Sequence, residues 1–139
     1  MPLYILDTDH VSLFQRKHAG VLSHIEKISR TDLATTIVTA EEQIQGRFKV
    51  IKRATTGSKL VTAYSDLQNT LNYFELLAVL PFDESANAQY ENLRQQKIRI
   101  GTYDLRIAAI TLSVSGILVT RNHIDFARVP KLEIEDWSA

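Results

Sequence analysis

Cysteine is absent from this chain of 139 residues, which excludes disulfides and cysteine-based zinc or iron–sulfur centres. No apolar run approaches the roughly 20 residues that a membrane-spanning helix needs, and the N-terminus lacks the basic and apolar segments of a secretion signal. Glycine occurs only five times, in scattered positions, so there is no glycine-rich phosphate loop. From these absences we expect a cytoplasmic protein.

Charge is balanced overall but not locally. Lysine and arginine together number 16, as do aspartate and glutamate, so the net charge gives no argument for a nucleic-acid partner. Between residues 43 and 65, one basic cluster contains no acidic residue: Arg47, Lys49, Lys52, Arg53 and Lys59. This cluster is either a solvated helix face or a patch that contacts nucleic-acid phosphates.

The hydrophobic pattern alternates between two periods. Short apolar or β-branched segments are separated by stretches in which apolar residues recur every three or four positions. We predict strands at residues 3–6, 33–38, 79–82, 117–120 and 132–134, the last at an edge, with helices between them. Such alternation predicts a mainly parallel sheet covered on both faces. We therefore expect one α/β domain over residues 1–139.

Acidic residues lie close to the ends of the predicted strands. Asp7 follows the first strand, Asp125 follows the strand at 117–120, and Glu42 is expected in the first turn of the helix after the second strand. Asp104 falls in the first turn of a helix that Thr102 is predicted to cap. Because ligands of an open α/β sheet collect outside the carboxyl ends of its strands, these acids are predicted to meet at one edge.

Each acid also has an ordinary explanation on its own. Asp104 and Glu42 suit the positive end of a helix, and Asp7 and Asp125 suit turns or caps. Together, however, like charges are costly to bring close unless a cation neutralises them. Ligands that are all oxygen favour a hard ion, Mg²⁺ or Mn²⁺, which can also hold a substrate phosphate.

Other catalytic arrangements have little support in the sequence. The histidines, His10, His18, His24 and His123, show neither the spacing of a zinc-binding helix nor a cysteine partner. No Gly-x-Ser-x-Gly motif is present, so a serine nucleophile of that type is also unsupported. A surface or packing role is expected for His18 and His24, whereas His10 and His123 have neighbours that are candidate site residues.

Four segments resemble the VapC-type PIN domain. They are residues 6–9 (Leu-Asp-Thr-Asp), 38–42 (Val-Thr-Ala-Glu-Glu) with Gly46 four residues on, 100–109 (Ile-Gly-Thr-Tyr-Asp-Leu-Arg-Ile-Ala-Ala) and 119–126 (Val-Thr-Arg-Asn-His-Ile-Asp-Phe). The resemblance continues to Trp137 and covers nearly the whole chain in the family's order. The third and fourth segments are the most specific.

This resemblance implies a magnesium-dependent endoribonuclease with a three-layer α/β/α sandwich and a mainly parallel central sheet. It also implies a homodimer that is held inactive by a cognate VapB-like antitoxin. The matched positions are the acidic quartet that holds the metal, Asp7, Glu42, Asp104 and Asp125, and two supporting polar residues, Thr120 and Asn122. The basic cluster described above and Arg121 become candidate RNA contacts.

Several points stay open at this stage. Glu42 has the family's spacing to Gly46, but the neighbouring Glu41 is an alternative, and Asp9 departs from the asparagine or small polar residue more usual in the family. Asp7 and Asp9 also fit the opening motif of a haloacid-dehalogenase-like phosphotransferase, with Asp7 as nucleophile and Asp9 as acid/base. A non-catalytic PIN-like binding module and a PIN nuclease of RNA maturation are the remaining alternatives.

Overall fold

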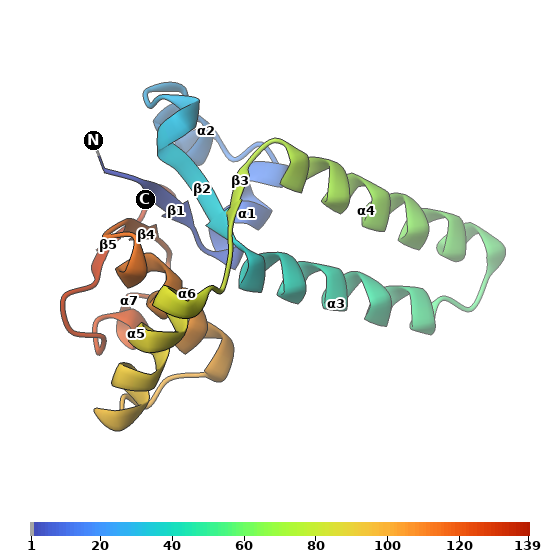
Figure 1. Cartoon of the computed structure of the whole chain (residues 1–139). Helices are drawn as coiled ribbons and strands as arrows, with labels where there is room; N and C mark the ends of the chain where they lie inside the picture. Colours follow the sequence, from blue (N-terminus) through green and yellow to red (C-terminus); the bar gives the residue numbers. More distant parts are fainter. Residues whose placement is uncertain (1) are drawn as a thin grey trace.

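The structure is a computed structural model that describes residues 2–139. Its centre is a sheet of five short strands: β1 (Tyr4–Leu6), β2 (Leu33–Thr36), β3 (Ala78–Leu80), β4 (Ile117–Val119) and β5 (Glu133–Glu135) (Figure 1). The strand order is β3-β2-β1-β4-β5, and every neighbouring pair is parallel. The predicted parallel α/β sheet is confirmed, with β5 at an edge.

Seven α-helices connect and cover these strands in the described residues. They are α1 (Thr8–Gln15), α2 (Ala19–Glu26), α3 (Ile37–Arg53), α4 (Gly57–Glu75), α5 (Glu84–Gln95), α6 (Thr102–Ser113) and α7 (His123–Phe126). A short 3-10 turn, Arg30–Asp32, precedes β2. Across residues 2–139, none of the helices combines the length and apolarity required to cross a membrane.

The sheet separates two apolar cores because successive strand side chains point to opposite faces. Ile5 belongs to the core formed with α5, α6 and α7, which includes the fully buried Ile107 and Phe126. Leu6 belongs to the second core, which α1 and α2 complete together with Trp137. The result is the expected three-layer α/β/α arrangement.

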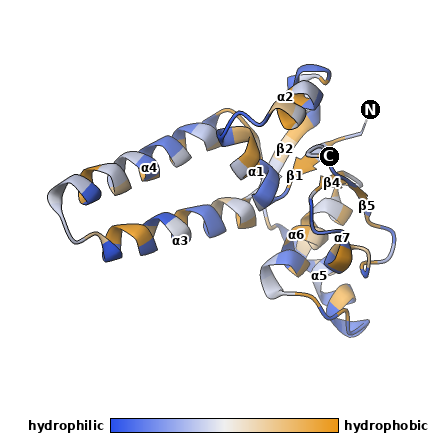
Figure 2. Ribbon diagram, turned by 180° about the vertical axis from the view of Figure 1, so that it is seen from behind, coloured by the Kyte–Doolittle hydropathy of each residue, from blue (hydrophilic) through white to orange (hydrophobic). Residues whose placement is uncertain are grey.

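Helices α3 and α4 form a long hairpin that extends away from the sheet (Figure 1). Inside the hairpin, the Arg47 Nε donates a hydrogen bond of 2.9 Å to the hydroxyl of the buried Thr70. Its surface carries large apolar side chains that remain at least 40% exposed. They are Ile37, Phe48, Val50, Leu60, Val61, Tyr64 and Leu71. Hydrophobic and hydrophilic residues alternate along both helices of the hairpin (Figure 2).

Two predicted helix starts were wrong. The second strand ends at Thr36, whose hydroxyl accepts from the Thr39 amide and caps α3, so residues 37–38 are helical and Glu42 lies in the second turn. Helix α6 begins at Thr102 itself, with Gly101 in the capping position. The short helix α7 was not predicted.

A glycine before β4 generates a prediction about the fold. A Cβ on Gly116 would lie 2.6 Å from the Ile5 Cδ1 and 3.0 Å from the Leu3 carbonyl oxygen, whereas nothing lies within 4 Å of a Cβ on Gly46 in α3. Gly116→Ala should therefore lower the free energy of unfolding by about 1–3 kcal/mol, the usual cost of overpacking. Gly46→Ala should raise it by about 0.5–1 kcal/mol.

Urea unfolding of both variants measures this difference, and their opposite signs provide the control. A neutral or stabilising Gly116→Ala would contradict the close packing of the start of β4 against β1.

Candidate active site

Asp7 stands at the carboxyl end of the central strand β1 and is buried. Its Oδ1 accepts a 2.8 Å hydrogen bond from the Thr8 amide, so the side chain caps α1. Its Oδ2 accepts another, also of 2.8 Å, from the hydroxyl of the buried Thr120, directly after β4. Asp7 therefore joins the ends of the two strands between which the order of the sheet reverses.

Glu42 approaches the same place from α3. Its Oε1 accepts a 2.9 Å hydrogen bond from the hydroxyl of Thr8, which is the residue after Asp7. Glu41 is instead exposed, and its Oε2 accepts a long, 3.5 Å bond from the Tyr103 hydroxyl. Of the two neighbouring glutamates, the structure thus directs Glu42 toward Asp7.

Asn122 connects the two remaining acids. Its Nδ2 donates to the Oδ2 of Asp125 at 3.1 Å and, at the long distance of 3.5 Å, to the Oδ2 of Asp104. Its Oδ1 accepts from the Asp125 amide and so caps α7. Helix α6 supplies Asp104 from its first turn, as predicted.

The carboxylates influence one another's ionisation. Burial raises the pKa of Asp7 to about 7, and repulsion from Asp9 and Asp104 adds to the effect. Burial and then the charge of Asp104 raise the pKa of Glu42. Burial raises the pKa of Asp104 as well, with repulsion from Asp125 as the next cause. Asp104 is therefore the acid that interacts electrostatically with each of the other three.

The acids lie at the position where open α/β sheets bind ligands. Strands β2 and β4 pair with β1 on opposite sides, so the chain leaves the sheet in two directions at the carboxyl end of β1. In open α/β sheets, ligands bind outside the carboxyl ends of the strands at such a reversal. The acids predicted from the sequence are brought together there by hydrogen bonds through Thr8, Thr120 and Asn122.

The basic residues of α3 lie along the hairpin, away from the acids. Arg53 follows Glu42 by 11 residues in the same helix, a rise of about 16 Å. Arg47 is held by Thr70 through its Nε, while Lys49 and Lys52 are exposed. Arg121 is exposed after β4, where its Nε donates to the Ser138 hydroxyl at 3.1 Å. Their contact with RNA stays a prediction.

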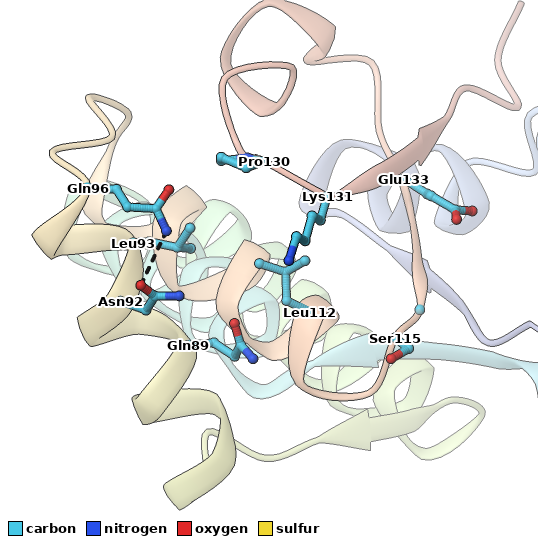
Figure 3. Close-up of a pocket in the computed structure, with 10 residues that line it drawn as sticks. Gln89, Asn92, Leu93, Gln96, Leu112, Ser115, Pro130, Lys131 and Glu133 are labelled. Atoms are coloured by element: carbon cyan, nitrogen blue, oxygen red, sulfur yellow. Dashed lines mark hydrogen bonds between the residues drawn. The ribbon is translucent and has the colours of Figure 1, made fainter.

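A hollow of about 460 Å³ lies at the opposite edge of the sheet, near the starts of β4 and β5 (Figure 3). Gln89 and Asn92 of α5 and Gln96, which follows that helix, line one side of it, and Lys131 and Glu133 line another. It contains none of the four acids, so the candidate site lies at the carboxyl ends of the strands and not in this hollow.

The acids suit a hard cation by their chemistry and charge. Their ligand atoms would be carboxylate oxygens, the preferred ligands of Mg²⁺ and Mn²⁺, and a dication would relieve the repulsion that raises their pKa values. Within residues 2–139, no three acidic or histidine side chains are close enough together to form a ready set of metal ligands. Binding of a cation would therefore draw the carboxylates closer.

Thr8 and His10 are residues whose place in the site the sequence did not predict. The Thr8 hydroxyl positions Glu42, yet a threonine after a strand-end aspartate reads as part of a turn. His10 is fully buried beside Asp9, and its isolated position in the sequence gave no metal or catalytic spacing. Neither role follows from residue spacing, since both depend on contacts with distant elements.

Comparisons with known proteins identify relatives of the chain. The chain is 30% identical over 142 residues to Ribonuclease VapC2 of Rickettsia felis, covering 97% of this chain and 98% of that protein. It matches the crystal structure of VapBC2 from Rickettsia felis bound to a promoter DNA fragment with a TM-score of 0.76 and 25% identity, covering 97% and 98% of the two chains. No protein-family model matches the chain.

A further structure supports the fold alone. DNA-bound VapBC from Salmonella typhimurium matches with a TM-score of 0.81 at 22% identity, covering 99% of both chains. The parallel sheet and the acids at its carboxyl edge define an α/β protein with a polar strand-end site. Given its likeness to the Rickettsia felis ribonuclease along nearly its full length, the chain belongs to the VapC family of ribonucleases, the PIN-type toxins of VapBC systems.

The raised pKa of Asp7 generates a prediction about stability without metal. The pKa of Asp7 is about 7 in the folded protein, against an ordinary value of 3.8. Between these two pH values, the folded state therefore binds a proton on Asp7 that the unfolded state releases. This contribution to stability is fully present below about pH 4 and is lost as the pH rises through about 7. In EDTA at pH 8, Asp7→Asn should therefore raise the free energy of unfolding by about 1–3 kcal/mol, with a much smaller difference at pH 4.

Thermal unfolding at both pH values checks this result, and the amide still caps α1. Added Mg²⁺ should stabilise the wild type more than the variant. If the variant were less stable than the wild type at pH 8 in EDTA, the charged carboxylate of Asp7 would not be destabilising the folded protein.

Proposed function

We propose that this protein is a metal-dependent endoribonuclease that hydrolyses RNA phosphodiester bonds with Mg²⁺, or Mn²⁺ in its place, and that it is the toxin of a VapBC-type pair. The observation that supports the proposal is the hydrogen-bond network through Thr8, Thr120 and Asn122 that links Asp7, Glu42, Asp104 and Asp125 at the carboxyl edge of a parallel sheet. Membership of the VapC family of ribonucleases also supports the proposal.

The residues divide into holding and orienting roles. Asp7, Asp104 and Asp125 would hold the cation, while Glu42, fixed by Thr8, would orient the attacking water or a second ion. When bound, the ion polarises a phosphate oxygen and lowers the pKa of a coordinated water. Thr120 and Asn122 keep the carboxylates in place by hydrogen bonds, and no side-chain nucleophile is needed.

The structure gives the phosphotransferase alternative no support. That reading requires Asp9 to be free as an acid/base, but both of its oxygens accept hydrogen bonds. Its Oδ1 lies 2.8 Å from the His10 Nδ1, and its Oδ2 accepts from the Arg121 amide at 3.0 Å. A carboxylate whose two oxygens both accept hydrogen bonds within the protein is better suited to positioning its neighbours than to exchanging protons with a substrate.

Partners are proposed from the exposed apolar surface. The α3–α4 hairpin leaves Phe48, Val61 and Tyr64 more than half exposed, an apolar surface of the kind that marks protein contacts. We propose that a second copy of this chain and a VapB-like antitoxin are the partners. The Rickettsia felis and Salmonella typhimurium structures are VapBC assemblies, which supports the antitoxin as one partner.

Adjacent glutamates provide a matched test of the site. Glu42→Gln should lower the rate of RNA cleavage, because it removes a charge directed at the acids, whereas Glu41→Gln should stay within about 3-fold of the wild type. Asp104→Asn should reduce cleavage more than about 100-fold, beyond the 10–100-fold typical of outer-sphere metal partners. The assay follows a labelled single-stranded RNA with Mg²⁺, with EDTA as a control.

Each result bears on a separate part of the proposal. Full cleavage by Asp104→Asn, or cleavage that is indifferent to EDTA, would rule out the metal mechanism. A strong loss with Glu41→Gln and none with Glu42→Gln would mean that the helix register assigned to the site is wrong. Turnover of a phosphomonoester in place of RNA would favour the phosphotransferase alternative.

A further inference from the structure

Asp9 and His10 form a hydrogen-bonded connection that the proposed chemistry does not use. His10 in α1 is fully buried, and its two ring nitrogens have different partners. The Nε2 accepts a 3.1 Å hydrogen bond from the backbone amide of Trp137, near the C-terminus. The Nδ1 lies 2.8 Å from the Oδ1 of Asp9. The imidazole thus bridges the C-terminal segment and a carboxylate beside the candidate site.

These partners determine where the imidazole carries its hydrogen. A backbone amide can only donate, so the Nε2 of His10 is the acceptor and the Nδ1 carries the hydrogen that is donated to Asp9. The Oδ1 of Asp136 lies 3.4 Å from the same Nε2, but it already accepts 2.8 and 2.6 Å bonds from the amide and hydroxyl of Ser138. The partners of His10 therefore determine which of its ring nitrogens donates and which accepts.

Asp9 also forms a hydrogen bond with the loop after β4. Its Oδ2 accepts from the Arg121 amide at 3.0 Å and lies 3.4 Å from the Thr120 hydroxyl. Three hydrogen bonds in sequence thus join the backbone of Trp137 to the backbone of Arg121. The backbones of Arg121 and Trp137 are thus hydrogen-bonded to side chains of the first turn of α1.

The loop that Asp9 holds contacts three of the four acids. Thr120 donates to Asp7, and its hydroxyl also accepts from the Asn122 amide at 3.0 Å. Asn122 in turn lies within hydrogen-bonding distance of Asp125 and, more distantly, of Asp104. A shift of the Arg121 backbone would therefore move the two side chains that keep these carboxylates near one another.

We propose that Asp9 and His10 are a positioning pair, which fixes the loop of residues 120–122 and thereby sets the affinity of the acids for a divalent cation. The proposal rests on the proposed metal-dependent function. The pair would not touch the cation or RNA, because Asp9 uses its oxygens on His10 and Arg121, and His10 is enclosed. Its effect is transmitted through Thr120 and Asn122.

Two substitutions of His10 separate positioning from packing. The amide nitrogen of asparagine lies where the imidazole Nδ1 was, so His10→Asn keeps a donor for Asp9 and loses the bond to Trp137. The amide group of glutamine reaches the position of the Nε2, so His10→Gln keeps an acceptor for Trp137 and loses the donor to Asp9. Both variants lose the ring and neither changes the charge. Because asparagine is the smaller side chain, a packing effect alone should be at least as large in His10→Asn as in His10→Gln.

The readout is Mn²⁺ affinity, measured by isothermal titration calorimetry, beside the thermal midpoint of each variant without metal. His10→Gln should weaken Mn²⁺ binding by 10-fold or more, the range typical of outer-sphere partners, about 10–100-fold. His10→Asn should stay within about 3-fold of the wild type, although both midpoints fall. Equal Mn²⁺ affinities in the two variants would overturn the positioning role and leave His10 a packing residue.

A second pair covers the case in which the His10 variants do not fold. Asp9→Asn cannot accept from both neighbours, and Asp136→Asn removes an equal charge without a bond to the loop; the two aspartates are 31% and 25% exposed. Because the charge of Asp9 also acts directly on Asp7 and Asp104, both affinities are measured at high salt, which screens that direct effect. Asp9→Asn should lose at least 10-fold in Mn²⁺ affinity and Asp136→Asn less than 3-fold; equal losses would reject the proposal. A wild type that binds no Mn²⁺ would instead reject the proposed function itself.

Discussion

Mutual repulsion among carboxylates at the end of β1 is the constraint on which the site depends. Asp7 is buried where its negative charge is poorly solvated, and Asp104 adds to the repulsion felt by Asp7 and Glu42. Within the described residues, no lysine or arginine forms an ion pair with any of the four acids. Neutral donors hold them instead, which leaves the negative charge of the site available to a cation.

The fold keeps this costly arrangement in place through backbone hydrogen bonding and caps. The Asp7 amide donates to the Val119 carbonyl at 2.9 Å, so the ends of β1 and β4 stay in register. Asp7 and Asn122 each begin a helix with a side chain that also reaches the site. The same residues therefore start the local structure and position the acids, so a change at either one would affect both.

Much of this arrangement could be predicted from the sequence. The edge position of the last strand and the location of Asp7, Asp104 and Asp125 near strand or helix ends follow from hydrophobic periodicity and from the geometry of parallel sheets. The start of α3 was misplaced because Ile37 and Val38 are β-branched and extend the apparent strand, whereas the capping hydroxyl of Thr36 decides the boundary.

Contacts between distant segments explain what the sequence could not reveal. The family's spacing favoured Glu42 over Glu41, but the bond that orients Glu42 comes from the Thr8 hydroxyl, 34 residues away. The engagement of Asp9 depends on Arg121, 112 residues away, and that of His10 on Trp137, 127 residues away. The spacing of residues along the chain does not predict contacts between segments this far apart. A single sequence shows which residue types are present but not which of them come into contact.

The most direct measurement of the central claim is the location of a divalent cation in a crystal of the protein soaked with Mn²⁺, found by anomalous diffraction. The account predicts an anomalous peak bounded by the carboxylates of Asp7, Asp104 and Asp125, which will have moved closer together. A fully occupied Mn²⁺ peak elsewhere, with no peak among these carboxylates and the carboxylates unmoved, would contradict the assignment of these acids as the metal centre.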